Sequence, residues 1–191
     1  MSALPKERED QTFTYSDYKE WELAEGERFE LIHGEAFAMS SPNTTHQLIL
    51  TELFGQFFIF LRGKPCKVFS SPYDVRLFYD EDENDDTVVQ PDIMVICDKE
   101  KLGPEGCRGA PDLIIEILSP SNTAIEMQRK LRLYREAQVR EYWLVDPVNK
   151  GLTVYFFPDE VIKGAIYGSA DIVPVSVLPG LEINLVQVFG E

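Results

Sequence analysis

Two short apolar stretches that each contain an acidic residue constrain this chain more than any other feature. Residues 88–97 carry Asp92, and residues 112–118 carry Glu116. Both indicate strands, and a continuous apolar run such as the second is typical of a strand buried in the centre of a sheet. An unpaired buried charge costs several kcal/mol, so buried acids are normally paired or bound to a metal. We therefore expect the fold to bring a cation to these two carboxylates.

The helix predicted after the second stretch carries a candidate for that cation. Residues 123–137 follow the helix-start signal S-P-S-N. Lys130 lies three residues after Met127, on the apolar stripe of this helix. A lysine there must extend to solvent or meet an acid, and Glu116 lies at the end of the strand that leads into the helix. The alternative is an ordinary surface pair between Lys130 and Glu126.

Two carboxylates and one lysine that converge are the minimum set for metal-assisted hydrolysis of a phosphodiester. A second Pro-Asp pair ends at Asp112, four residues before Glu116. At the rise of a strand, their Cα atoms are about 13 Å apart, too far to share one metal. Asp92 is therefore the chosen partner of Glu116, and Asp112 is interpreted as a strand-start or loop-capping residue.

Three further polar residues have open interpretations. Glu30 lies among apolar residues of a predicted hairpin at 28–39, either as a solvent-facing strand residue or as a supporting acid near the site. His46 lies in the first turn of a predicted helix at 45–61, either as a hydrogen-bonded structural residue or as part of the site. Asp74 precedes a neighbouring strand and is a candidate supporting acid.

The order of the elements predicts an α/β fold in which helices pack against a sheet. Ser16 is the expected N-cap of a first helix, and the hairpin is expected to turn at His33-Gly34. The helix at 45–61 is apolar around much of its circumference, which predicts a largely buried helix. Residues 98–110 are expected to form a loop. Other strands are predicted at 66–69, 74–78, 141–145, 152–157, 162–167 and 172–177, with helical segments at 17–24 and 185–189.

Composition predicts one domain over residues 1–191, with a polar, disordered segment at 1–11. The cysteines Cys66, Cys97 and Cys107 have no C-x-x-C spacing, so neither a disulfide framework nor a zinc site is expected. No signal region is visible, and no apolar run reaches the roughly 18 residues of a membrane span. We expect a cytoplasmic protein with no membrane partner.

The charge balance opposes a nucleic-acid partner. The net charge is −15, whereas nucleic-acid-binding proteins usually carry a basic surface. Six acidic residues fall within residues 80–86, a run that is typical of a solvated, mobile loop tip. Without them the chain retains about −9 (−15 + 6). The sequence therefore predicts weak non-specific affinity for DNA.

Seven segments in order resemble one protein family. An α-β-β-β-α-β unit with acids on its second and third strands is similar to the PD-(D/E)XK nuclease superfamily. The segments resemble those of the Uma-two family of restriction-endonuclease-like bacterial proteins, over about residues 12–189. The resemblance implies a nuclease-like core at about 45–146, with a central mixed sheet flanked by helices, an N-terminal helix and hairpin, and extra C-terminal strands. The segments are R-F-E-L-I-H-G-E, S-P-N-T-T-H-Q, S-P-Y-D-V-R-L, V-V-Q-P-D, G-A-P-D-L-I-I-E-I-L-S-P-S, K-L-R-L-Y and E-Y-W-L-V-D-P.

The resemblance also implies residue roles. Asp92, Glu116 and the carbonyl of Ile117 would bind Mg²⁺ or Mn²⁺. The superfamily usually places a lysine two residues after its acid, but that position is Leu118 here, so the usual E-x-K is broken. The lysine of this family moves to the following helix, which points to Lys130. Supporting roles would fall to Glu30 and His46.

The activity that this resemblance implies is metal-dependent endonuclease cleavage of DNA. The alternative is a catalytically silent nuclease-fold module that binds nucleic acid or another protein, favoured by the acidic charge and the missing E-x-K. Cleavage of both strands of a duplex requires two sites related by a two-fold axis, so a homodimer is predicted. Tyr155, Phe156, Phe157 and the strands after them either cover an edge of the sheet or form the interface.

Overall fold

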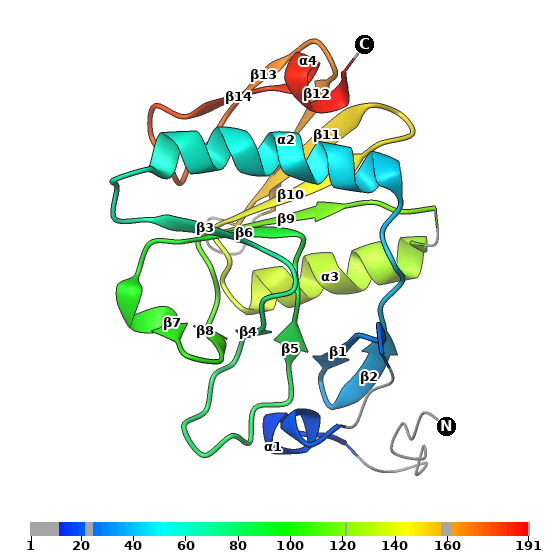
Figure 1. The fold of residues 1–191 in the computed structure, drawn as a ribbon, viewed down its shortest axis with the longest axis vertical. Helices are drawn as coiled ribbons and strands as arrows, with labels where there is room; N and C mark the ends of the chain where they lie inside the picture. The colour runs from blue at the N-terminus through cyan, green and yellow to red at the C-terminus, as the bar shows by residue number, and fades with distance from the viewer. Residues whose placement is uncertain (1–11, 22–24, 121, 158–161, 191) are drawn as a thin grey trace.

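A six-stranded mixed sheet forms the centre of the molecule (Figure 1). The computed structural model describes residues 12–21, 25–120, 122–157 and 162–190, so the prediction for residues 1–11 lies outside the described part. The strand order is β12-β11-β10-β9-β6-β3; β9 and β10 run parallel, and the neighbouring pairs are antiparallel. The strands are β3 (Lys67–Ser70), β6 (Ile93–Ile96), β9 (Leu113–Ile117), β10 (Glu141–Asp146), β11 (Gly151–Phe156) and β12 (Lys163–Gly168).

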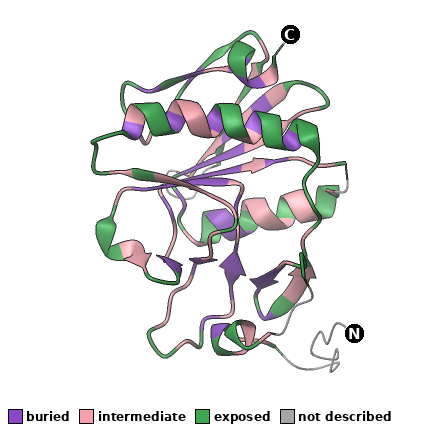
Figure 2. Ribbon diagram, viewed as in Figure 1, coloured by how far each residue is buried: buried purple, intermediate pink, exposed green. Residues whose placement is uncertain are grey.

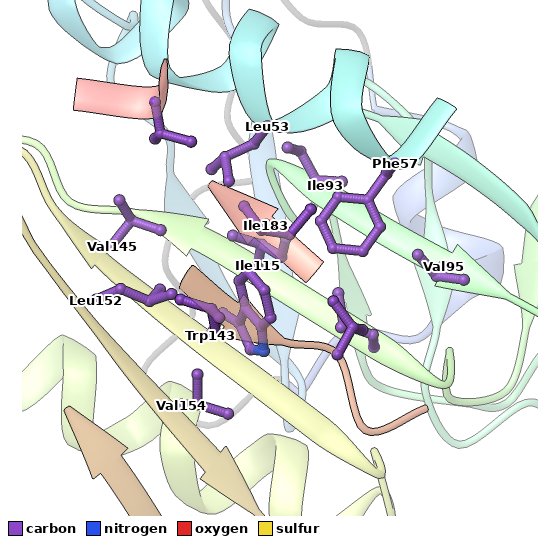
Figure 3. Close-up of a cluster of buried hydrophobic side chains, with 14 of the residues drawn as sticks. Leu53, Phe57, Ile93, Val95, Ile115, Trp143, Val145, Leu152, Val154 and Ile183 are labelled. Atoms are coloured by element: carbon purple, nitrogen blue, oxygen red, sulfur yellow. The ribbon is translucent and has the colours of Figure 1, made fainter. Parts of the chain in front are cut away.

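Helices cover both faces of this sheet. α2 (Thr44–Leu61) and the short α4 (Leu185–Phe189) lie on one face, and α3 (Ala124–Glu136) lies on the other (Figure 1). Side chains of a strand alternate between its two faces, so β9 contributes to both cores. Ile115 of β9 packs with Phe57 and Trp143 under α2 (Figure 3), and Ile114 packs with Tyr134 under α3. The predicted α/β fold with helices against a sheet is confirmed.

A second six-stranded sheet lies beside the first, in the order β2-β1-β5-β4-β8-β7. The predicted hairpin is its β1–β2 pair, and both turn residues, His33 and Gly34, have positive φ. The predicted loop at 98–110 is wrong in part, because it contains a 3₁₀ turn, η1 (Lys99–Lys101), and two strands. The strands are β1 (Phe29–Ile32), β2 (Glu35–Ala38), β4 (Val75–Arg76), β5 (Val88–Val89), β7 (Leu102–Gly103) and β8 (Gly106–Arg108).

The prediction of one strand over residues 88–97 is wrong, because the structure has two strands there. β5 belongs to the second sheet and β6 to the central sheet, and Asp92 lies between them. Pro91 has no backbone N–H to donate to a ladder, and it restricts the residue before it. The chain therefore leaves one sheet at the Pro91-Asp92 pair and enters the other directly afterwards.

The first helix begins earlier than predicted. α1 (Tyr15–Lys19) has Thr14 at its N-cap in place of Ser16, and Asp17 completes a capping box with Thr14. Both Ser16 and Thr14 are good capping residues, so their types alone do not decide between them. The helix also ends earlier than predicted, because residues 20–21 lie beyond the helix, while the predicted residues 22–24 lie outside the described part.

Helix α2 is less buried than its composition predicts. His46, Ile49, Leu53, Phe57 and Leu61 are buried at helical spacing against the sheet. The opposite face is exposed in spite of its apolar residues, and Ile59 there is 72% exposed (Figure 2). Within the described residues, no helix combines the length and the apolar character that a membrane crossing requires.

The prediction of a solvated loop tip is wrong in part, and the prediction about the cysteines is wrong. Asp85, in the acidic run, is buried and accepts hydrogen bonds from Arg76, so that part of the run is a structural ion pair. Cys66 and Cys97 form a disulfide. Lys67 and Ile96 are cross-strand partners in the antiparallel β3–β6 pair, so the two cysteines occupy the next opposed positions.

The C-terminal segment adds to the central sheet and to its core. Tyr155 of β11 stacks on Tyr142 of β10, and Phe156 packs against the core under α2. These two side chains therefore cover the sheet of their own chain. Two further strands, β13 (Ile172–Pro174) and β14 (Glu182–Asn184), form a separate antiparallel pair.

Candidate active site

The predicted site residues meet where the two sheets join. Asp92 lies at the junction between β5 and β6, and Glu116 projects from β9 of the central sheet. Lys130 comes from α3 and Glu30 from β1 of the second sheet. Residues separated by up to 100 positions in the sequence are therefore brought together by both sheets and one helix.

Lys130 is held between two acids. Its Nζ lies 2.9 Å from Glu116 Oε1 and 3.1 Å from Glu30 Oε2. Tyr134, one helical turn later, donates its hydroxyl to the same Glu116 Oε1 at 2.5 Å. The predicted approach of Lys130 to Glu116 is therefore confirmed, whereas Glu126 bonds to Asn122 at the start of α3. The surface pair between Lys130 and Glu126 is excluded.

Burial and neighbouring charges shift the protonation of this cluster. Burial raises the pKa of Glu116 to about 7; Lys130 opposes the shift, and the charges of Asp92 and Glu30 add to it. Burial alone would lower the pKa of Lys130, but Glu116 and Glu30 outweigh it and raise that pKa. Lys130 therefore remains an ammonium ion, while Glu116 exchanges a proton easily near neutral pH.

Asp92 is fixed from two sides. Its Oδ2 accepts a hydrogen bond from the backbone N–H of Ile117 at 2.8 Å and lies 3.1 Å from His46 Nε2. Asn43 caps α2 by accepting from the His46 N–H, which places the histidine in the first turn of that helix. Burial would lower the pKa of His46, but its hydrogen bond to Asp92 and the charge of Asp92 raise it. His46 therefore lies at the site, beside the aspartate.

Glu30 is buried, with 4% of the residue exposed, so it does not face solvent. The backbone N–H of Gln90 donates to Glu30 Oε1 at 3.1 Å and orients the carboxylate toward Lys130. The side chain of Gln90 donates to Asp74 Oδ1 at 2.8 Å, and Tyr18 donates to the same oxygen. Asp74 thus lies behind Glu30 and touches neither Lys130 nor Asp92 in the described hydrogen bonds.

The other Pro-Asp pair lies elsewhere. Asp112 accepts from the backbone N–H of Cys97 and from Arg140, so it links strand ends, as predicted. Sequence reasoning missed Tyr134 and Gln90 as parts of the site. Tyr134 carried a usable signal, because a residue four positions after Lys130 lies on the same helix face. The contact of Gln90 is made by its backbone, which no residue type reveals.

The site opens into a cleft of about 520 Å³. The β1–β2 hairpin forms one wall, the start of α2 another, and the start of α3 a third. Its lining is mainly polar and includes the charged or ionisable residues Arg28, Glu30, His46, Asp92, Glu116 and Lys130. An extended chemical group can therefore reach the carboxylates from solvent.

The carboxylates retain oxygens for a ligand. Among the described residues, Asp92 Oδ1 and Glu116 Oε2 accept no hydrogen bond, while the second oxygen of each group is occupied. In that same part of the chain, no three His, Cys, Asp or Glu side chains converge as a metal cluster. Mg²⁺ is usually held by one or two carboxylates and keeps several waters, so this donor set fits it. Ile117, whose backbone N–H donates to Asp92, lines the same cleft.

A solved structure shows the same type of fold. The crystal structure described as "a putative nuclease belonging to DUF820", from Anabaena variabilis, matches with a TM-score of 0.74 at 20% identity. The match covers 93% of this chain and 97% of that one. The chain thus has the α/β fold of a nuclease-like protein.

The sequence comparison names the family. Residues 15–186 match the Uma2 family model, described as "Putative restriction endonuclease", so the chain belongs to the Uma2 family. A protein described as "Uncharacterized protein slr1290", from Synechocystis sp., is 27% identical over 145 residues, which cover 75% of this chain and 74% of that protein. Family membership supports a nuclease-like function with nucleic acid as the substrate.

Proposed function

We propose that the protein is a Mg²⁺- or Mn²⁺-dependent endonuclease that hydrolyses phosphodiester bonds of DNA. The observation that carries this proposal is the bridge of Lys130 between Glu116 and Glu30, beside Asp92 in an open cleft. Two carboxylates with unbonded oxygens and one ammonium ion are the groups that such hydrolysis needs.

Each residue has a definite task in this proposal. Asp92, Glu116 and the Ile117 carbonyl would hold the metal, which when bound supplies Lewis acidity and a water of lowered pKa. Lys130 would orient the attacking water or stabilise the negative charge that develops on the phosphoryl group. Glu30 positions Lys130, and His46 positions Asp92, through the contacts described above. Water reaches the site through the open side of the cleft.

The proposal accounts for the departure from E-x-K. Leu118 occupies the usual lysine position and lines a small hollow together with Glu116 and Lys130. The ammonium group thus reaches the acid from α3 instead of from β9. Because the same two charged groups meet, the chemistry does not require the lysine to lie on the strand.

The test is a cleavage assay with matched aspartate variants. The purified protein is expected to cut or nick circular DNA, single-stranded or duplex, with Mg²⁺ or Mn²⁺ and to be inactive with a chelator. Asp92→Asn should abolish cleavage, because it removes a ligand charge. Asp112→Asn, in the other Pro-Asp pair, should retain it. Equal activity of Asp92→Asn and the parent would show that the site is assigned wrongly.

A silent binding module is the second candidate. The net charge of −15 and the missing E-x-K favour it. Metal-dependent thermal unfolding separates the two, because a ligand that binds only the folded state raises the unfolding temperature. The endonuclease proposal expects a rise with Mg²⁺ that Glu116→Ala abolishes. No rise at millimolar metal, together with no cleavage, would favour a module that binds nucleic acid or protein.

A further inference from the structure

The cleft at the site continues along the hairpin. A second hollow, of about 220 Å³, lies between β2 and α3. Arg28 lines only the first hollow, and Arg129 lines only the second. The two hollows adjoin, because they share Glu30, Phe37, Ala38, Glu126 and Lys130. An extended ligand that fills both would pass directly over the buried lysine and its acids.

Few positive charges face this path. The lysine and arginine residues that line the two hollows are Arg28, Arg129 and Lys130. His46, which also lines the first hollow, is paired with Asp92. Lys130 is engaged by Glu116 and Glu30, so its charge is already compensated. The two arginines remain, one at each end of the path.

Arg28 is half-buried and forms no ion pair within the described residues. It precedes β1 by one residue, and its carbonyl accepts from the Met39 N–H, which extends the hairpin pairing. Arg28 and Glu30 are two residues apart on an extended strand, so their side chains face the same side. Both side chains face the cleft, because both residues line it.

Arg129 is held in place by an aromatic ring. Its guanidinium carbon lies 4.0 Å from the centroid of Phe37, in β2. A cation over a ring is partly ordered, and its N–H donors at the edge stay available. No ion pair of Arg129 is formed within the described part of the chain. A planar guanidinium of this kind suits an anionic phosphate oxygen.

We propose, resting on the endonuclease function above, that the substrate strand is single and lies between the β1–β2 hairpin and α3. Arg28 and Arg129 each bind one phosphate, on opposite sides of the reacting phosphodiester. Proteins that bind duplex DNA tightly neutralise many phosphates, about 6–10 in well-studied cases. Two arginines, beside the acids Glu30, Asp92 and Glu116, suffice for one strand only.

The salt dependence of binding measures the number of phosphate contacts. Fluorescence anisotropy would follow a labelled single-stranded oligodeoxynucleotide and a duplex of equal length, with Ca²⁺ held constant and NaCl varied. Two contacts predict a slope of log K against log salt of about −1.4 for the single strand. Arg28→Ala or Arg129→Ala should each reduce the slope to about −0.7 and weaken binding about tenfold. The double variant should lose the salt dependence.

Control variants separate charge from folding. Arg28→Lys and Arg129→Lys keep the charge and should keep the slope of the parent. Arg62→Ala removes an exposed arginine at the far end of α2 and should change nothing. Circular dichroism of every variant should match the parent.

Each possible result decides the proposal. Tighter binding of the duplex, no binding of either DNA at low salt, or slopes that the two alanine variants leave unchanged would overturn it. The predicted slopes without any cleavage would support this mode of binding and count against the catalytic function. Cleavage of duplex DNA that neither alanine variant affects would count against this mode of binding and support the catalytic function.

Discussion

At the scale of single residues, the decisive feature is a lysine compensated by two acids. With both acids ionised, Lys130, Glu116 and Glu30 would carry one excess negative charge, and Asp92 lies next to them. Burying such a cluster costs free energy unless every charge has a partner. Stabilisation of the fold alone is therefore a weak explanation for its presence. Among the described residues, two carboxylate oxygens of this site accept no hydrogen bond, which supports the cation binding proposed above.

Replacement of Lys130 tests its task directly. Lys130→Met keeps the length of the side chain and removes its charge. We expect metal-dependent cleavage to fall by at least about 100-fold, because the stabilisation of developing negative charge is lost. The fold should persist, because Glu116, whose pKa is already about 7, can take up a proton when its partner is removed. Circular dichroism and the cleavage rate would be measured together.

The neighbouring Arg132 provides the matched control. It lies on the same helix with an exposed side chain, so Arg132→Met removes an equal charge without touching the site. Its cleavage rate should equal that of the parent. A folded Lys130→Met protein with full activity would refute the catalytic assignment of this lysine.

The sequence predicted those residues whose chemistry conflicts with their surroundings. Asp92, Glu116 and Lys130 stand out because each interrupts an apolar pattern. Glu30 stayed ambiguous, because the pattern of β1 does not reveal that both of its faces are covered; all of its residues are buried. The backbone contact of Gln90 depends on the path of the chain and not on a side chain.

At the scale of elements, the start of α3 sets the position of the lysine. Thr123 accepts from the Glu126 N–H, and Glu126 bonds back to the Thr123 N–H, which forms a capping box. These contacts satisfy backbone donors that the helix leaves free at its first turn. The capped first turn fixes how α3 is rotated about its axis, and thereby the direction in which Lys130 points.

We expect Thr123→Ala to lower the free energy of unfolding by about 1 kcal/mol, the usual value of a lost N-cap. Urea denaturation followed by circular dichroism would measure it. Thr51→Ala is the control, since the Thr51 hydroxyl only bonds back to the Gln47 carbonyl within α2. That change should be neutral or slightly stabilising. Equal effects of the two changes would mean that the cap does not stabilise α3.

Helices were predicted more accurately than strands. The long helices α2 and α3 lie within one residue of the ranges 45–61 and 123–137, because caps and apolar spacing are local signals. Strand pairing depends on residues far apart in the sequence. The sequence therefore did not reveal that residues 88–97 are divided at Pro91 into two strands, β5 and β6, that belong to different sheets. The Cys66–Cys97 disulfide was missed for the same reason: its partners lie 31 residues apart and meet only through the β3–β6 register.

At the scale of the whole molecule, two exposed apolar sites among the described residues bear on assembly. One is the outer face of α2, with Leu48, Phe58 and Ile59. The other is the edge strand β12, where Ile166 is 83% exposed. Edge strands present unpaired backbone groups and are usually protected by charge, proline or cover. The predicted homodimer would pair the free backbone groups of β12 with those of a second copy, because two antiparallel copies of one strand are related by a two-fold axis.

We therefore predict a homodimer through β12, with a mass of about 44 kDa (2 × 21.8 kDa) by light scattering at tens of micromolar. Ile166→Lys should give the 21.8 kDa monomer, because two lysines would face each other across the axis. Leu48→Lys, on the exposed face of α2, is the matched control and should leave the dimer intact. A dimer that Leu48→Lys breaks and Ile166→Lys spares would place the interface on α2. A parent protein of monomeric mass would contradict the homodimer itself.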